Sequence, residues 1–187
     1  KGKAKNIVLL DCGIKNNSIR NFLDRGANII RVPWNYDFLS KGIACDGLFI
    51  SNGPGDPMLI TETHAIVKKA LKARLPTFGI CLGNQLMSIA AGAKTYKLKF
   101  GHRGQNQPCM DLETKRCYIT TQNHGFAVDA KTLPKKDWSV WFENVNDHTV
   151  EGVKHKTLPF FAVQFHPEST PGPIDTEWLF DKFMKVL

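Results

Sequence analysis

The chain reads Pro76-Thr77-Phe78-Gly79-Ile80-Cys81-Leu82-Gly83 where a short apolar run meets a helix-like pattern, so one cysteine lies between two glycines. Flanking glycines remove side-chain clashes, and the residue between them can then stand exposed at the edge of a sheet. The free N–H groups and dipole of the next helix, expected over Asn84 to Ala91, favour a thiolate there. The pattern predicts a cysteine nucleophile at position 81; a buried cysteine in a glycine-rich turn is the alternative.

A second candidate group, His166-Pro167-Glu168, follows an apolar run at 160–165 that is typical of a buried strand. Residues two apart in an extended chain face the same side, so His166 and Glu168 can approach one site while the proline stiffens the backbone between them. An imidazole can take a thiol proton and later deliver it to a leaving amine, while a carboxylate orients the ring. Alone, this tripeptide would be an ordinary strand exit with solvated polar groups. Together with the cysteine elbow, it predicts a triad of Cys81, His166 and Glu168.

A third feature is the loop Ser51-Asn52-Gly53-Pro54-Gly55-Asp56-Pro57, which follows the strand-like run 47–50. Loops at the carboxyl edge of a parallel sheet form ligand crevices, and their backbone N–H groups can face a developing oxyanion. We assign the N–H groups of Gly53 and Leu82 as the two oxyanion donors. An ordinary turn would explain the glycines and prolines, but it would not explain why this loop occurs in the same chain as the cysteine elbow and the His166-Pro167-Glu168 group.

Strand-like and helix-like segments alternate through the first half of the chain. Strands are expected at 6–10, 28–32, 47–50 and just before Cys81, and helices at 16–25 and 60–73. From Lys94 onward short strands are expected, including 117–121, 139–142 and 149–154, before a closing helix at 175–187. We therefore predict an α/β fold with a mostly parallel central sheet flanked by helices, and a smaller antiparallel, strand-rich portion in the second half.

Length and composition indicate one globular domain over residues 1–187. At 42% hydrophobic residues the chain can bury one substantial core, and no apolar run approaches the 20 or so residues of a membrane span. The net charge is +8, but the basic residues are scattered without a recognised nucleic-acid-binding module, so we expect no nucleic-acid partner. The cysteine count is odd and includes no C-x-x-C pair, which suits a reducing cytoplasm: Cys12, Cys45, Cys81, Cys109 and Cys117. The remaining histidines are dispersed along the sequence and predict no metal site: His64, His102, His148 and His155.

Taken together, Cys81, the His166-x-Glu168 pair and the loop at 52–57 resemble the triad-type (class I) glutamine amidotransferases. Further segments are similar to the glutaminase domain of carbamoyl-phosphate synthase: Gly101 to Pro108, Gln122 to Val128, and Pro171 to Asp175. The run Asn106-Gln107-Pro108-Cys109 is similar to the eukaryotic pyrimidine-pathway form. The resemblance spans nearly the whole chain.

This resemblance implies hydrolysis of L-glutamine to glutamate and ammonia through a cysteinyl γ-glutamyl thioester, with no cofactor in this domain. It implies that Cys81 attacks the carboxamide, His166 acts as acid and base, and Glu168 orients the ring. Other positions match the oxyanion loop or the residues that hold the backbone end of the substrate: Gly53, Gly55, Leu82, Gln85, Asn123, Gly125 and Phe126. His124 lies in the same motif and is expected to shape the loop at 123–125, with a proton relay as the alternative.

The resemblance also implies partners. Ammonia would pass to an ATP-using carbamoyl-phosphate synthetase domain or subunit, and the scattered positive charge could help an acidic partner to dock. The chain begins at Lys1 and enters the first strand almost at once, so we expect a domain excised from a longer polypeptide. The missing part would hold the N-terminal domain of the small subunit, including a serine that helps to bind glutamine. No membrane partner is expected.

The chain departs from the family pattern at position 84. Family members often carry histidine where this chain has Asn84, and we expect this asparagine to accept backbone N–H bonds near the helix start.

Three other functions remain open from the sequence. The first alternative function is the amidotransferase half of a GMP or anthranilate synthase, and the second is a γ-glutamyl or thiol peptidase. The third is a regulatory module without turnover.

Overall fold

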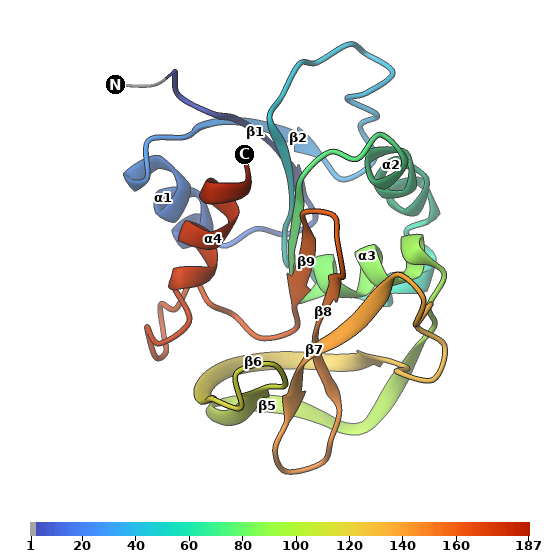
Figure 1. Cartoon of the computed structure of the whole chain (residues 1–187), viewed down its shortest axis with the longest axis vertical. Coiled ribbons are helices and arrows are strands. Elements are labelled where there is room, and N and C mark those ends of the chain that lie inside the picture. Colours follow the sequence, from blue (N-terminus) through green and yellow to red (C-terminus); the bar gives the residue numbers. More distant parts are fainter. Residues whose placement is uncertain (1–2) are drawn as a thin grey trace.

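The computed structural model describes residues 3–187, which form one nine-stranded sheet with helices packed on it (Figure 1). The strands are β1 (Asn6–Asp11), β2 (Asn28–Pro33), β3 (Gly47–Ile50), β4 (Thr77–Ile80), β5 (Thr95–Asp111), β6 (Cys117–Val128), β7 (Trp138–Asn144), β8 (Val150–His155) and β9 (Phe160–Val163). The helices are α1 (Asn16–Asp24), α2 (Thr61–Lys72), α3 (Leu82–Ala91) and α4 (Trp178–Val186), with a short 3-10 turn, η1 (Pro57–Leu59). Within this described part, no helix combines the length and apolar character needed to cross a membrane.

The sheet is mixed rather than mostly parallel. Its strand order is β2-β1-β3-β4-β9-β8-β6-β5-β7, and the five strands from β2 to β9 pair in parallel. All pairings beyond β9 are antiparallel, and β5 and β6 form a long curved ribbon at one end of the molecule (Figure 1). The predicted antiparallel portion is therefore present but is not the smaller one. Its extent was underestimated because β5 is rich in polar and charged residues and is almost entirely exposed or half-buried, so it gives no apolar strand pattern.

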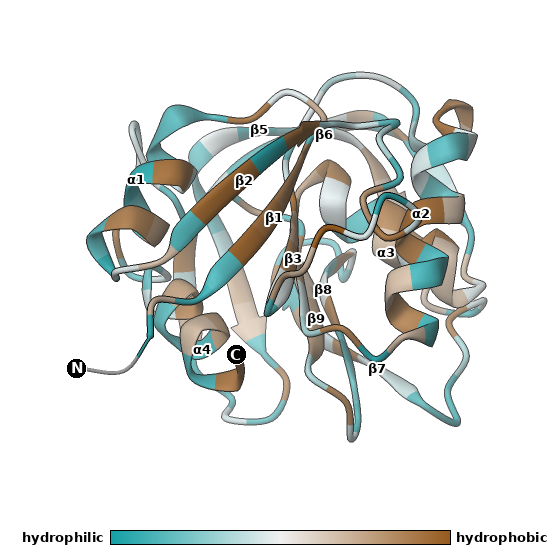
Figure 2. Cartoon of the chain, turned by 90° about the horizontal axis from the view of Figure 1, so that it is seen from above, coloured by the Kyte–Doolittle hydropathy of each residue, from teal (hydrophilic) through white to brown (hydrophobic). Residues whose placement is uncertain are grey.

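The parallel half holds much of the core, because its four inner strands, β1, β3, β4 and β9, are buried on both faces. In β1 the fully buried Val8 and Leu10 belong to the apolar cluster that includes α2 and α3, whereas Ile7 and Leu9 belong to an aromatic-rich cluster with α1 and α4. Figure 2 shows this apolar character along β1. Strands that are covered on both faces consist of continuous apolar residues, so their positions could be predicted from the apolar runs in the sequence.

The junction between β4 and α3 depends on two glycines. A Cβ at Gly83 would lie 2.2 Å from the carbonyl oxygen of Ile50, and one at Gly79 would lie 2.6 Å from the carbonyl oxygen of Gly83. Both distances are far below van der Waals contact, so the first turn of α3 can pack on the ends of β3 and β4 only without these side chains. The glycines thereby set the position of the cysteine between them.

Replacing Gly83 with alanine should therefore destabilise the fold. We expect the free energy of unfolding to fall by about 2–4 kcal/mol, because the added methyl group meets backbone rather than a movable side chain. Urea unfolding followed by circular dichroism measures this change. Gly125→Ala is the matched control, since an added Cβ there has no atom within 4 Å. Equal stability losses in the two variants would contradict the packing argument.

Candidate active site

Cys81 occupies the sharp turn between β4 and α3, as the sequence predicts. Its backbone has φ 54° and ψ −102°, a conformation that costs a non-glycine residue about 1–3 kcal/mol. The turn is held by a hydrogen bond from the Cys81 N–H to the carbonyl oxygen of Val163 (2.8 Å), and the Cys81 carbonyl accepts from the N–H of Asn84 (3.1 Å). The prediction that this residue is exposed at the edge of the sheet is wrong, since Cys81 is only 4% exposed.

The sulfur lies in the wall of a cavity of about 630 Å³ at the carboxyl ends of the parallel strands. Most of the predicted site residues line this cavity: Gly53, Gly55, Cys81, Gln85, Asn123, Gly125, Phe126 and His166. Two predicted residues do not line it. Glu168 is completely buried, and the side chain of Leu82 packs into the core. A cavity of this size accommodates a small amino acid.

His166 and Glu168 form a buried pair beside the cavity. The Nδ1 atom of His166 lies 2.7 Å from Oε1 of Glu168, and the two residues are 5% and 0% exposed. Burial by itself would lower the pKa of His166, but the interactions with Cys81 and Glu168 outweigh it and raise this pKa to about 10. Burial would conversely raise the pKa of Glu168, and the hydrogen bond from His166 lowers it overall. The arrangement therefore favours a protonated His166 ring between the Cys81 side chain and the Glu168 carboxylate.

The pH dependence of stability should reflect this pair. Because the pKa of His166 rises from 6.5 to about 10 on folding, its stabilising contribution is fully present below pH 6.5 and is lost as pH rises through 10. We expect the free energy of unfolding to decline over this range, and to decline less in His166→Gln. Urea unfolding at pH 6.5, 8 and 10 provides the comparison. Parallel curves for the two proteins would show that His166 makes no such contribution.

The loop after β3 contacts the elbow at the two predicted oxyanion positions. A Cβ at Gly53 would lie 2.1 Å from the carbonyl oxygen of Cys12 and 2.9 Å from Cδ2 of Leu82, so only glycine fits between them. Leu82 is the first residue of α3, where helix geometry leaves the backbone N–H without a partner in the helix. The assignment of these two N–H groups as oxyanion donors remains a prediction.

Gln164, which the sequence reasoning missed, links the elbow to the far wall of the cavity. Its Nε2 lies 3.6 Å from Sγ of Cys81, and its Oε1 accepts from Nε2 of Gln85 (3.1 Å) and from Nδ2 of Asn84 (3.1 Å). Gln85 also donates to the carbonyl oxygen of Phe126 (2.9 Å). A polar residue in an otherwise apolar run at 160–165 was the available signal.

Asn84 does not play the capping role that we expected. Helix α3 begins at Leu82, so Asn84 is already inside the helix, where it is completely buried. Its side chain donates to Gln164 instead of accepting backbone N–H groups, and its Oδ1 has no partner among the described residues. The residue therefore helps to orient Gln164 beside the thiol.

Residues after β1 form another wall that the sequence analysis did not assign. Gly13 and Lys15 line the cavity, and Asn52 connects them to the loop after β3 by donating to the Gly13 carbonyl (2.9 Å) and accepting from the Lys15 N–H (3.3 Å). The Nζ of Lys15 lies 3.4 Å from Oε1 of Glu168. The position of this loop at the carboxyl end of a parallel strand was the signal for its role.

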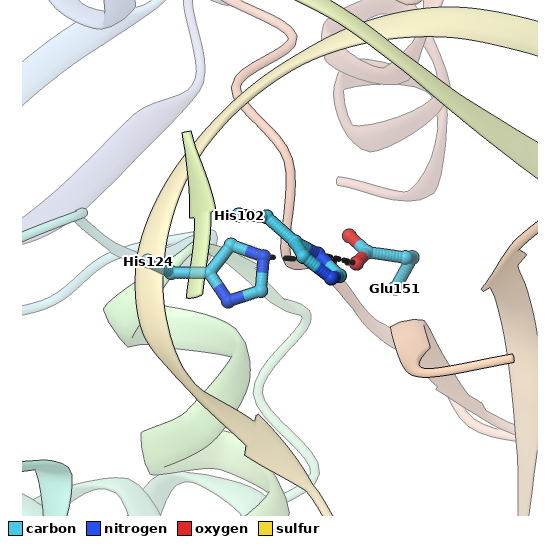
Figure 3. Close-up of side chains that lie close together, drawn as sticks. All are labelled: His102, His124 and Glu151. Carbon is cyan, nitrogen blue, oxygen red and sulfur yellow. Dashed lines mark hydrogen bonds and ion pairs between the residues drawn. The ribbon is translucent and has the colours of Figure 1, made fainter. Parts of the chain in front are cut away.

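One group of side chains has the composition of a metal site. Nitrogen atoms of His102 and His124 and a carboxylate oxygen of Glu151 lie within 4.8 Å of one another (Figure 3). His102 and His124 are far apart in the sequence, which is why the sequence predicts no metal site there, but β5 pairs with β6 and places His102 directly opposite His124. The motif around His124 also lies inside strand β6 rather than in a loop.

Comparisons with known proteins agree with this geometry. Residues 8–186 match the family model described as "Glutamine amidotransferase class-I". The multifunctional protein URA2 of Saccharomyces cerevisiae is 54% identical over 187 residues, covering 100% of this chain and 8% of that protein. The carbamoyl phosphate synthase small chain of Pyrococcus furiosus is 48% identical over 183 residues, covering 97% of this chain and 49% of the relative. The chain thus spans less than half the length of these relatives.

A solved structure supports the same fold. The crystal structure of a Thermoplasma acidophilum protein, described as part of a GMP synthase, superposes with a TM-score of 0.85, covering 100% of this chain and 95% of that chain. The sequence identity is 23%, so this likeness speaks for the fold alone. The family match, by contrast, extends over almost every residue and includes the cysteine elbow and the His166–Glu168 pair. This chain therefore belongs to the class-I glutamine amidotransferase family.

Proposed function

We propose that this chain hydrolyses L-glutamine to glutamate and ammonia. The observation that carries the proposal is the buried pair of His166 and Glu168, joined to Cys81 at a strained elbow in the wall of a 630 Å³ cavity. In the proposed reaction the Cys81 thiolate attacks the carboxamide carbon, and the oxyanion is bound by the N–H groups of Gly53 and Leu82. Such donors are each worth about 3 kcal/mol in comparable sites.

The protons are handled by one imidazole. His166 gives its proton to the amide nitrogen, the C–N bond breaks, and ammonia leaves. The γ-glutamyl group stays attached to the Cys81 sulfur as a thioester. The neutral ring then takes a proton from water, whose oxygen attacks the thioester, and glutamate leaves as the thiolate is restored. Glu168 keeps the ring oriented and stabilises its charged form. The proposed cycle needs no cofactor in this domain.

The opposite wall would hold the amino acid end of glutamine. We infer this role for Gln85, Asn123, Gly125 and Phe126, and we assign Gly55 to the loop that closes the oxyanion side. The following basic side chains also line the cavity and would attract the α-carboxylate: Lys15, Lys97 and Arg103. Binding at this wall would place the carboxamide over the sulfur.

The ammonia would be used by a carbamoyl-phosphate synthetase domain or subunit in pyrimidine biosynthesis. The support is the name of the relative from Pyrococcus furiosus and the 54% identity to a multifunctional protein. The proposal includes an N-terminal domain that precedes this region, and it includes neither a nucleic-acid nor a membrane partner. A cytoplasmic location is part of the proposal, because five free cysteines, one of them exposed, fit a reducing compartment.

The direct test is to incubate the purified chain with L-glutamine and to measure ammonia and glutamate. We expect equal amounts of the two products, at a low rate that increases when the synthetase partner is added. γ-Glutamyl peptides serve as competing substrates. Faster hydrolysis of these peptides than of free glutamine, or the absence of ammonia release with and without the partner, would contradict the proposal.

A further inference from the structure

A compact polar cluster lies next to the part of β6 that lines the cavity. We call it the His102 cluster; it consists of His102 on β5, Gln122 and His124 on β6, Glu151 on β8 and Asp147 in the turn before β8. The rings of His102 and His124 meet edge to face with their centroids 4.9 Å apart, and the Glu151 carboxylate points at them (Figure 3). The mechanism above makes no use of His102, Asp147 or Glu151.

Glu151 is the unusual member, because its carboxylate is completely buried. Its Oε1 lies 3.2 Å from Nδ1 of His102, 3.6 Å from Nε2 of His124 and 3.3 Å from the hydroxyl of Thr149, while its Oε2 has no partner among the described residues. Burying an unpaired carboxylate costs several kcal/mol, so it persists only beside compensating charge. The imidazole ring of His102 provides that charge.

His102 is positively charged at neutral pH. The hydrogen bond with Glu151 is the largest influence, and together with Asp147 it outweighs burial and raises the pKa of His102 to about 9. Asp147 lies 2.8 Å from Nε2 of His102, so each ring nitrogen faces a carboxylate. The ring is thereby fixed between β8 and the turn that precedes it.

The cluster reaches the cavity through Gln122 and His124. Oε1 of Gln122 lies 2.7 Å from Nδ1 of His102 and 3.1 Å from Nε2 of His124. On its other side, His124 donates from Nδ1 to the carbonyl oxygen of Phe126 (2.8 Å), the same oxygen that accepts from Gln85. The orientation of the His124 ring therefore sets two cavity-lining groups, the backbone at position 126 and the amide of Gln85.

We propose that His102 and Glu151 are positioning residues for glutamine binding, acting through Gln122 and His124 on the cavity wall formed by Asn123 to Phe126. The inference rests on the proposed function. Neither residue lines the cavity, and neither is bonded to Cys81, His166 or Glu168. Loosening the cluster should consequently weaken substrate binding and leave the thiol chemistry nearly intact.

The test compares Glu151→Gln and His102→Gln with the wild-type chain. Glu151→Gln removes the charge from the bond to His102, and His102→Gln removes the charged contacts with both Glu151 and Asp147. In each variant we expect KM for glutamine to rise about ten-fold while kcat changes less than about three-fold. Glu143→Gln is the matched control, because Glu143 makes a similar 2.8 Å contact with the exposed His148 on the surface. KM in the control should equal that of the wild type. If Glu151→Gln does not fold, His102→Gln carries the test.

Alkylation of Cys81 separates positioning from general loss of structure. Iodoacetamide lacks the amino acid end of glutamine and should label Cys81 at the wild-type rate in both variants. A glutamine-like diazo-ketone should need about ten-fold higher concentrations to saturate labelling, and the double variant should lose less than the sum of the two single losses. A wild-type chain that releases no ammonia with or without the synthetase partner would instead refute the proposed function.

Three outcomes would overturn the positioning role. The first is an unchanged KM in both folded variants. The second is an equal fall in iodoacetamide and analogue labelling, which would indicate a merely structural effect. The third is one equivalent of zinc or another divalent ion in the purified wild-type protein, lost in Glu151→Gln, because the histidine and carboxylate ligands would then serve a metal.

Discussion

Replacing Cys81 with alanine should remove ammonia release from glutamine, with a loss in kcat on the order of 10⁶-fold, as for nucleophile removal in other triads. Among the described residues, Cys81 is the only cysteine that lines the cavity. Cys109, which is buried against Thr120 and Gln122, has a pKa raised by burial, and Cys12 has a pKa raised to about 12 for the same principal reason. Neither thiol is ionised at neutral pH, so neither is a ready nucleophile.

The control for this variant is Cys117→Ala, since Cys117 is exposed on β6 and does not line the cavity. Its kcat and KM should match the wild type. Glutamine binding should survive in Cys81→Ala, because the opposite wall is unchanged, and equilibrium dialysis with labelled glutamine measures this. Residual turnover of more than about 1% in Cys81→Ala would show that another group attacks the substrate.

Replacing His166 with glutamine should reduce kcat by about 10⁴-fold or more, because one ring serves both as the acid that protonates ammonia and as the base that activates water. The variant should also have a less reactive Cys81, because the ring that takes the thiol proton is gone. The raised pKa of His166 depends partly on Cys81, so the two side chains interact directly. Iodoacetamide labelling of Cys81 at pH 7 should therefore slow markedly.

His148→Gln provides the comparison, since His148 is an exposed histidine bonded to Glu143 on the surface. Its turnover and labelling rates should equal those of the wild type. The base role would be refuted if His166→Gln kept wild-type kcat. If kcat fell but labelling stayed unchanged, His166 would act on the leaving group without activating the thiol.

Local patterns predicted the parallel half of the fold well. The strand Gly47–Ile50 has the predicted bounds, because it is a continuous apolar run that ends at a glycine-rich loop. Helix α2 was expected over 60–73 and spans Thr61–Lys72. Each of these elements is determined by its own apolar periodicity, which a sequence displays directly.

The antiparallel half was harder to predict because pairing between distant strands determines it. Strand β6 was expected to end near residue 121, but it continues to Val128 through Gln122, Asn123 and His124. These polar residues break the apolar pattern because they line the cavity or belong to the His102 cluster. The polar residues that hide the apolar pattern of β6 are therefore the same residues that line the cavity or form the His102 cluster.

The residues of the candidate site also fall into two groups, those that the sequence predicted and those that it did not. Cys81, His166 and Glu168 were predicted because glycines and a proline restrict the backbone around them, which leaves a local signature. Gln164 and Glu151 carry no such signature. Their contacts depend on the register between β8 and β9 and on the packing of α3, and a single sequence does not display either.

Mass spectrometry of the protein during turnover is the decisive test of Cys81 as the nucleophile. After rapid acid quenching in the presence of L-glutamine, we expect one γ-glutamyl adduct, located on Cys81 by peptide mapping and absent from Cys81→Ala. A diazo-ketone analogue of glutamine should give a stable adduct on the same sulfur. Glutamine turnover without any adduct on Cys81, or an adduct on another residue, would show that Cys81 is not the nucleophile.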